Sequence, residues 1–345
     1  MGAYGFMVYY TYKVYILVLV NLRMYIIRGG IYLRSGEGNM PFLYVINVSK
    51  KDSHKFAEIT GFEGSVRELV VPDRIEGYVV EAIGNHAFSG RDDIESVVLP
   101  NTIKTLYGFA FHNCRKLRKI SLFDSIDDYY DGVCRQCDSL SDIEIHIERN
   151  WYEVIRNFLA DNDRTLRFMI KRDEFTSCLV FPEYVYDFSE NTMARTIQFS
   201  IGGSGMIYRE CVDRRSVNYR EYDKLFEKAV IDGNAVSEDI AIGRVLFPYE
   251  LAPGYRERYE MFIKKNGRSI VERLIKNIEN SGENASLDED EVSPMNLIKR
   301  LIPILDDEAM DHAIKLASEK GLTLLSAVLI GSKKPPVASV SRFEF

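Results

Sequence analysis

The sequence predicts an α+β protein in which a short right-handed β-solenoid precedes a mostly α-helical domain of helix pairs. Two observations predict this fold. One stretch repeats an apolar pattern every 23 residues, and the apolar positions after residue 216 follow the period of a helix. The chain has 345 residues, enough for two or three domains. We divide it into a leader (1–39), a solenoid (40–150), a mixed connector (151–215), a helical domain (216–331) and a flexible tail (332–345).

Residues 1–39 are rich in Tyr, Val, Leu and Ile but match neither template for a membrane segment. Only nine uncharged residues separate Lys13 from Arg23, whereas a spanning helix needs about 20 mostly apolar residues. No basic region precedes the apolar run and no small-residue cleavage site follows it, so a cleaved signal peptide is a poor match. Two interpretations stay open. Either translation starts at Met40, because residues 36–39 can be encoded by a purine-rich ribosome-binding site, or the leader is a native amphipathic or anchoring segment.

A 23-residue repeat begins near residue 57. Phe88 and Phe111 lie 23 residues apart, as do Cys114 and Cys137. A pattern of three apolar residues recurs at the same interval in three copies: Ile94, Val97 and Leu99; Leu117, Ile120 and Leu122; Leu140, Ile143 and Ile145. Alternating apolar positions are typical of a short strand. Because one such unit cannot bury its apolar face alone, the stacked copies predict a solenoid with a continuous core.

These residues resemble the BspA-like leucine-rich repeat family, whose copies follow the pattern IG-x-x-AF-x-x-C-x-x-L-x-x-V-x-LP. One copy matches almost throughout, with Ile83, Gly84, Ala87, Phe88, Ile94, Val97, Leu99 and Pro100. A later copy departs, because Val133 and Cys134 stand at the Ala-Phe positions, and we expect less regular packing there. The resemblance covers residues 57–147 and implies a leucine-rich repeat β-solenoid. It also implies, as an alternative role, a surface module that binds host or matrix proteins.

Cys134 and Cys137 form a Cys-x-x-Cys pair, which in isolation fits a redox pair or half of a zinc site. The repeat gives a simpler explanation, since Cys137 occupies the position of Cys114 and Cys134 replaces a buried phenylalanine. No second pair of ligands follows at zinc spacing, so we predict no metal and no cofactor. Five cysteines are few and odd in number, which favours a reducing compartment over a disulfide framework.

From Tyr219 the apolar spacing becomes helical. We predict a helix near residues 219–230, a helix hairpin over residues 255–278 and a helix pair over residues 310–329. Residues 281–293 contain five acids and no base, which predicts a solvated linker. A further helix over residues 151–159 is expected to cap the exposed end of the solenoid. Residues 164–212 are assigned only as mixed α/β.

No motif in the chain assigns catalysis. The glycine-rich residues 202–205 lack the glycine at position 206 that a nucleophile elbow needs, and no phosphate-loop motif occurs. The formal net charge of −7, from 51 acidic and 44 basic residues, disfavours nucleic acid as a partner. The arginine-rich residues 206–228 are nearly neutral in sum, so their attraction for phosphates is weak. We therefore predict no catalytic residue and no nucleic-acid partner.

The leading hypothesis is a cytoplasmic, non-enzymatic interaction or scaffold protein that binds a protein partner through the solenoid. Side chains between the buried positions of each strand face outward, which selects seven candidates for the binding surface: Arg67, Val70, Val98, Lys119, Ser121, Asp142 and Glu144. Two alternatives stay open. One is a cell-surface adhesin, in which a native leader attaches the chain to a membrane. The other is an enzyme whose site in the helical domain matches no known motif.

Overall fold

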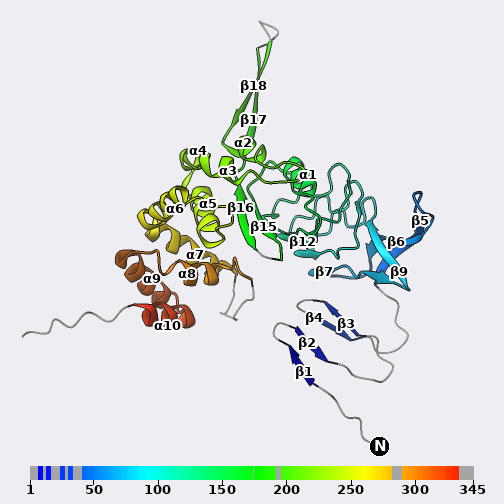
Figure 1. The fold of residues 1–345 in the computed structure, drawn as a ribbon, viewed down its shortest axis with the longest axis horizontal. Helices are drawn as coiled ribbons and strands as arrows, with labels where there is room; N and C mark the ends of the chain where they lie inside the picture. The colour runs from blue at the N-terminus through cyan, green and yellow to red at the C-terminus, as the bar shows by residue number, and fades with distance from the viewer. Residues whose placement is uncertain are drawn as a thin grey trace, which may run out of the picture.

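The chain folds into a β-solenoid followed by a helical domain, as a computed structural model shows (Figure 1). It describes residues 41–173, 175–191, 196–281 and 290–333, together with four short strands near the N-terminus. These strands form two antiparallel hairpins: β1 (Met7–Tyr10) with β2 (Lys13–Ile16), and β3 (Met24–Ile27) with β4 (Gly30–Leu33). The predicted α+β fold class is confirmed. The proposed start at Met40 and residues 334–345 of the predicted tail lie outside the described residues.

One long sheet of the solenoid stacks its strands in register. Its order is β16-β15-β14-β12-β10-β7. The strands in chain order are β7 (Glu68–Val70), β10 (Ser96–Val98), β12 (Lys119–Phe123), β14 (Asp142–His146), β15 (Leu166–Lys171) and β16 (Thr176–Phe181). All neighbours are parallel except the antiparallel pair β15–β16. The register aligns one buried side chain from each parallel strand, namely Leu69, Val97, Ile120, Ile143 and Phe168.

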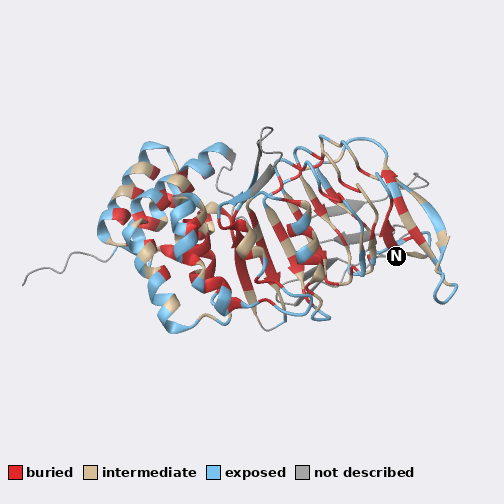
Figure 2. Cartoon of the chain, turned by 90° about the horizontal axis from the view of Figure 1, so that it is seen from above, coloured by how far each residue is buried: buried red, intermediate tan, exposed pale blue. Residues whose placement is uncertain are grey.

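A second sheet of the solenoid has the order β13-β11-β9-β6-β5. Its strands are β5 (Phe42–Val48), β6 (Lys55–Phe62), β9 (Tyr78–Ile83), β11 (Thr105–Leu106) and β13 (Asp128–Tyr129), and β8 (Arg74–Ile75) pairs with β9. Buried side chains of both sheets belong to one hydrophobic core. Figure 2 shows these buried positions continuing from the solenoid into the helical domain. The core is therefore shared along the chain, as stacked repeats require.

The coil that departs from the repeat pattern is still closely packed. Val133 and Cys134, which replace the Ala-Phe pair, are both fully buried. The thiol of Cys137 donates a hydrogen bond to the carbonyl of Phe111 at 3.0 Å, and Cys114 donates in the same way to Phe88 at 3.1 Å. Each repeat cysteine therefore ties its turn to the preceding coil, and the predicted loss of regularity at this coil is wrong.

The sheet continues past Ile147, where the 23-residue pattern ends. Strand β15 pairs in parallel with β14, and Phe168 lies opposite Ile143 after an interval of 25 residues. The longer interval arises because helix α1 (Glu153–Asp161) replaces the usual turn of this coil. The helix predicted at residues 151–159 thus exists, but it lies within a coil instead of capping the solenoid. Strand β16, with helix α5 (Asn234–Leu246) packed on it, follows the last parallel strand.

The helices after the solenoid pack against one another. In chain order they are α2 (Gly205–Arg209), α3 (Tyr219–Lys224), α4 (Phe226–Asp232), α5, α6 (Pro253–Lys265), α7 (Gly267–Ser281), α8 (Pro294–Leu301), α9 (Asp307–Glu319) and α10 (Thr323–Ser332). The predicted hairpin corresponds in sequence to α6 and α7, but α6 packs mainly on α5 and α7 mainly on α9. The predicted pair over residues 310–329 corresponds to α9 and α10, and the predicted helix near residues 219–230 is divided at Leu225. Before α2, strands β17 (Val185–Asn191) and β18 (Thr196–Gly202) form a hairpin that projects from the body (Figure 1).

Local sequence signals explain several helix ends. Proline occupies the first turn of α6 and α8, where its missing N–H costs no helical hydrogen bond. The Ser293 side chain accepts a hydrogen bond from the backbone N–H of Asn296, and Asp306 accepts one from Ala309. Gly321 adopts a positive φ of 71° just after α9, a conformation that glycine reaches without strain. The Ser293 and Asp306 caps thus fix the starts of α8 and α9, and Gly321 marks the end of α9.

Candidate functional site

The outward side chains of the long sheet form a regular grid, which we call the strand face. One row contains Glu68, Ser96, Lys119, Asp142 and Arg167, and the next contains Val70, Val98, Ser121, Glu144 and Met169. A shorter third row contains Phe123, His146 and Lys171. Six of the seven residues selected from the sequence lie in these rows. The seventh, Arg67, directly precedes β7 and forms an ion pair with Glu95 at 2.8 Å.

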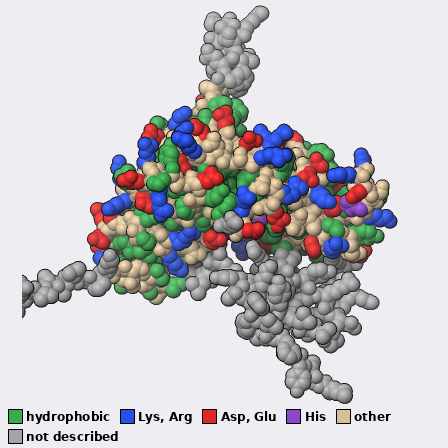
Figure 3. Space-filling view, viewed as in Figure 1, with side chains coloured by type: hydrophobic (Ala, Val, Ile, Leu, Met, Phe, Trp, Pro, Cys, Tyr) green, Lys and Arg blue, Asp and Glu red, His purple; other side chains and the backbone are tan. Residues whose placement is uncertain are grey.

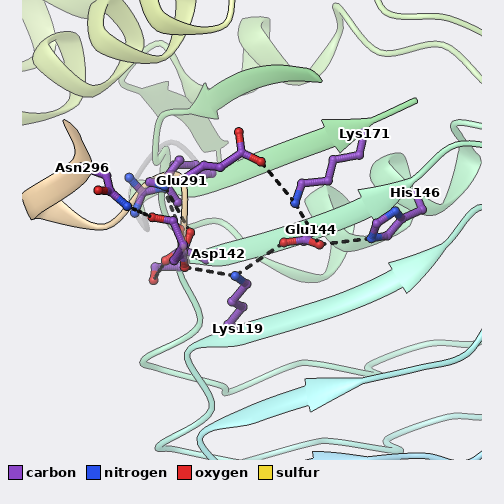
Figure 4. Close-up of polar contacts among 11 residues, drawn as sticks. Lys119, Asp142, Glu144, His146, Lys171, Glu291 and Asn296 are labelled. Carbon is purple, nitrogen blue, oxygen red and sulfur yellow. Dashed lines mark hydrogen bonds and ion pairs between the residues drawn. The ribbon is translucent and has the colours of Figure 1, made fainter. Parts of the chain in front are cut away.

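Glu144 is the centre of a charged cluster on the strand face (Figure 4). Its carboxylate lies 3.5 Å from the Lys119 ammonium, 3.3 Å from that of Lys171 and 3.1 Å from Nε2 of His146. Burial would raise the pKa of Glu144, but the hydrogen bond with His146 and the charges of both lysines lower it to about 2. Glu144 is therefore ionised at neutral pH although its side chain is only 15 % exposed.

The neighbouring acid, Asp142, is paired along its own row. Arg167 donates from Nε to Oδ1 of Asp142 at 2.6 Å, and the hydroxyl of Ser141 donates to Oδ2. Burial opposes the charge of Arg167, but Asp142 outweighs it and the pKa of Arg167 is raised. Both oxygens of Asp142 thus have partners within the chain. Its role on the strand face is to hold Arg167 in place.

The helical domain covers one end of the strand face. Met169 is buried in a hydrophobic cluster with Cys178, Phe247 and Val292. Phe247 directly follows α5, and Val292 lies just before α8. The carboxylate of Asp290 lies 3.1 Å from the Lys119 ammonium, and that of Glu291 lies 3.7 Å from the Lys171 ammonium. Figure 4 shows Glu291 reaching toward Lys171, beside Glu144 and Lys119 on the sheet.

The expectation of a solvated linker over residues 281–293 is therefore wrong for its last residues. Residues 290–292, which we call the acidic turn, contact the solenoid because opposite charges meet there and Val292 is buried in the cluster that contains Met169. Residues 282–289 lie outside the described residues. Lys171 and Arg167, which complete the cluster, were not selected from the sequence, since they follow the longer coil. His146 could have been found, because it lies 23 residues after Phe123.

The other end of the strand face is more open. Val70 and Val98 are adjacent across β7 and β10 and are both partly exposed. Beside them, Glu68 is exposed and the Arg67 side chain is 81 % exposed. Figure 3 shows basic and acidic side chains interspersed over the viewed face of the described residues. The open end thus offers apolar side chains flanked by charges of both signs.

Other groups that could carry chemistry have structural roles. All five cysteines are free and buried, Cys134 and Cys137 included. A Cβ on Gly205 would lie 2.3 Å from the carbonyl oxygen of Pro182, so close packing requires glycine here. Arg209 donates hydrogen bonds to the backbone carbonyls of Asn162, Arg164 and Pro182. In the described part of the chain, no group of three or more His, Cys, Asp or Glu side chains is placed to hold a metal ion.

Comparison with known proteins agrees with this geometry. Residues 65–167 match the family described as "BspA type Leucine rich repeat region (6 copies)". The repeat region is a BspA-type leucine-rich repeat solenoid. The match extends into β15, in agreement with the parallel pairing of β14 and β15. It begins at residue 65, a few residues after the start at residue 57 that the pattern predicts. A search of curated proteins found no match to this chain.

Several solved structures are similar to part of this chain, at low sequence identity. A leucine rich cell surface protein from Faecalibacterium prausnitzii is 20 % identical over 33 % of this chain and 34 % of its own, with a TM-score of 0.26. A leucine-rich repeat protein from Bacteroides capillosus is 18 % identical over 32 % of this chain and 89 % of its own, with a TM-score of 0.26. The leucine rich repeat protein of T. pallidum is 19 % identical over 30 % of this chain and 68 % of its own, with a TM-score of 0.22.

Within the described ranges, none of the helices combines the length and the apolar character needed to cross a bilayer.

Proposed function

We propose that this protein is a non-enzymatic interaction or scaffold protein whose solenoid binds a protein partner through the strand face. The observation that carries the proposal is the register of the long sheet, which holds outward side chains in fixed rows across five parallel strands. A rigid surface of this kind loses little conformational entropy on binding. Repeat solenoids offer such extended surfaces generally, and the BspA-type match supports a repeat-based interaction module here.

The open end of the strand face supplies the proposed contact. Val70 and Val98 give an apolar centre, and Ser121 continues their row toward the charged cluster. Arg67 and Lys119 flank the centre with positive charge. An apolar centre with a charged rim is the usual anatomy of a protein interface. In this proposal Glu144 and Asp142 position the basic side chains instead of contacting the partner themselves.

A paired substitution tests the proposed contact. Changing Val70→Asp and Val98→Asp places two charges at the centre of the interface, so we expect partner capture to fall at least about tenfold. Both side chains face outward, so we expect the variant to stay folded, with a melting temperature lowered only by the repulsion between the two carboxylates on adjacent strands. The matched control is Tyr130→Asp, because Tyr130 is 50 % exposed and adjoins β13 of the second sheet. The partner is identified by crosslinking from a photoreactive residue at position 98. Capture that resists V70D/V98D contradicts the proposal.

We further propose that the protein acts in the cytoplasm. All five cysteines are free thiols in buried positions, which supports a reducing compartment. Attachment to a membrane or to the cell surface would need the leader as a native segment. Cell fractionation with mass spectrometry of the natural N-terminus tests this. Peptides from residues 1–39 recovered in the membrane fraction would contradict the cytoplasmic assignment and favour a surface binder.

A further inference from the structure

We propose that Asp290 and Glu291 compete within the chain for the basic groups of the strand face, which recognises a partner segment with two adjacent acidic residues. This inference rests on the proposed function, because it concerns the same surface. The inference adds the chemistry of the partner segment. It also predicts that the native protein binds such a segment more weakly than a variant without the two acids does. The acidic turn then regulates access to the face.

The geometry shows why two carboxylates fit this place. Lys119 on β12 and Lys171 on β15 approach the single carboxylate of Glu144 from two sides, at 3.5 and 3.3 Å. One acid cannot balance two ammonium groups, and the acidic turn supplies the remaining negative charge. Asp290 lies 3.1 Å from Lys119. Glu291 lies 3.7 Å from Lys171 (Figure 4). Consecutive acids therefore match two lysines that the sheet holds apart at a fixed spacing.

The backbone of the acidic turn is held independently of these ion pairs. The side-chain amide of Asn296 donates to the carbonyl oxygen of Asp290 at 2.8 Å, and the N–H of Ser293 donates to the same carbonyl at 3.1 Å. Val292 is buried in a hydrophobic cluster that also contains Met169 and Phe247. Removing the negative charges of Asp290 and Glu291 should therefore leave the turn in place. Lys119 and Lys171 would lose only their ion pairs with the turn. The competitor is the pair of carboxylates and not the whole segment.

The ion pairs are accessible enough to exchange with a partner. The side chains of Lys119 and Asp290 are 35 % and 33 % exposed, and that of Glu291 is 48 % exposed. Partly exposed pairs of this kind contribute little net free energy, because water solvates each group when the pair opens. An acidic segment from another protein can therefore replace the internal carboxylates. The charge of the two lysines selects an acidic segment over a neutral or a basic one.

The test measures binding of a labelled peptide to the full chain. The probe is Ser-Leu-Asp-Glu-Asp-Glu-Val-Ser-Pro, which copies residues 286–294, and the control probe has all four acids replaced by their amides. We compare the native protein with D290N/E291Q. Asparagine keeps the oxygen that accepts the Val292 N–H at 3.1 Å, so the turn is retained. We expect D290N/E291Q to bind the acidic probe about tenfold more tightly than the native protein, with the gain shrinking in about 0.5 M salt.

Three controls make the result specific. Adding K119Q and K171Q to D290N/E291Q should abolish the gain, because the basic groups are lost. The variant E227Q/E257Q removes two exposed acids from α4 and α6 and should bind as the native protein does. The single variant E291Q, whose side chain is half exposed, should give a smaller gain in the same direction. Equal affinity of the native protein and D290N/E291Q, or equal binding of the amide probe, overturns the proposal.

The outcome also separates this inference from the proposed function. If D290N/E291Q gains no affinity for the acidic probe while V70D/V98D still weakens capture of the protein partner, competition by the acidic turn is rejected and the binding face stands. If the acidic probe binds D290N/E291Q more tightly while V70D/V98D has no effect, the charged cluster binds acids but the proposed apolar contact is rejected.

Discussion

Arg244 and Asp223 form an ion pair in the interior of the helical domain, with neither side chain more than 1 % exposed. The guanidinium binds the carboxylate through two hydrogen bonds of 2.8 and 2.9 Å. The hydroxyl of Tyr259 donates to the same carboxylate at 2.9 Å, and Arg244 also donates to the carbonyl of Tyr249. One carboxylate thus links helices α3, α5 and α6.

Replacing Asp223 with asparagine should destabilise the protein strongly. Arg244 would keep its charge without a buried counter-charge, and we expect a loss of about 3–5 kcal/mol in the free energy of unfolding. Urea denaturation measures this loss. The double variant D223N/R244M removes both charges, so its cost should be clearly less than the sum of the two single costs. A cost below about 1 kcal/mol for D223N would mean that the pair is not buried in solution.

A substitution at Phe111, whose ring stacks on that of Phe88, tests the solenoid core in the same way. The two rings stack with centroids 5.3 Å apart and planes 5° apart, and each side chain is 1 % exposed. Phe111→Ala should cost about 3–5 kcal/mol, since the lost ring leaves a cavity between coils. Tyr130→Ala is the control, because Tyr130 is 50 % exposed. A measured cost for Phe111→Ala below about 1 kcal/mol would show that the repeat register is wrong.

The sequence predicted the solenoid core because its repeat has a constant length. Each coil of 23 residues returns the same position to the same place, so Val97, Ile120 and Ile143 align in the sheet. The following coil contains a helix and needs 25 residues to bring Phe168 into the same row. A search at fixed period therefore loses β15, although its strand pairs normally. The period shows where coils are identical, and it cannot show where a coil of another length continues the sheet.

The candidate surface was predicted in part for a similar reason. Alternation within a strand identifies outward positions such as Val98 and Glu144 from local sequence alone. It carries no information on contacts from distant segments. Lys119 meets Asp290 across 171 residues of chain, and nothing near either residue signals that contact. Helix α5 was missed because its buried face includes the charged Arg244 and Glu238, which conceal the apolar period.

The cysteines should be unreactive in the folded protein. Burial raises the pKa of the Cys178 thiol to about 12, and burial also raises the pKa of Cys211 to about 12. Cys114 donates to a backbone carbonyl and its pKa is raised by the contact with Cys137 and by burial. We expect a thiol-specific reagent at pH 8 to modify no cysteine of the native protein within minutes and all five in urea. Rapid oxidation of Cys134 and Cys137 would instead support a redox pair.

The charge of Glu144 should make the stability of the protein depend on acid pH. Its pKa is lowered from 4.5 to about 2 in the folded state, so the folded protein holds the ionised form more strongly than the unfolded chain does. The stabilisation is therefore complete above about pH 4.5 and is lost as the pH falls toward 2, with a total of at most about 3 kcal/mol. Unfolding in urea between pH 2.5 and 6 measures this dependence.

The variant Glu144→Gln isolates that contribution. Other acids also lose stabilising ionisation in this range, among them Asp93, whose pKa is held low by Arg91. Both proteins share those acids, so the difference between their stabilities reports Glu144 alone. The gap between native protein and Glu144→Gln should be largest at pH 6 and should narrow as the pH falls. Glu148→Gln, on an exposed loop of the same solenoid, is the control for the substitution itself. A constant gap between native protein and Glu144→Gln would mean that His146 and the two lysines do not hold the Glu144 charge.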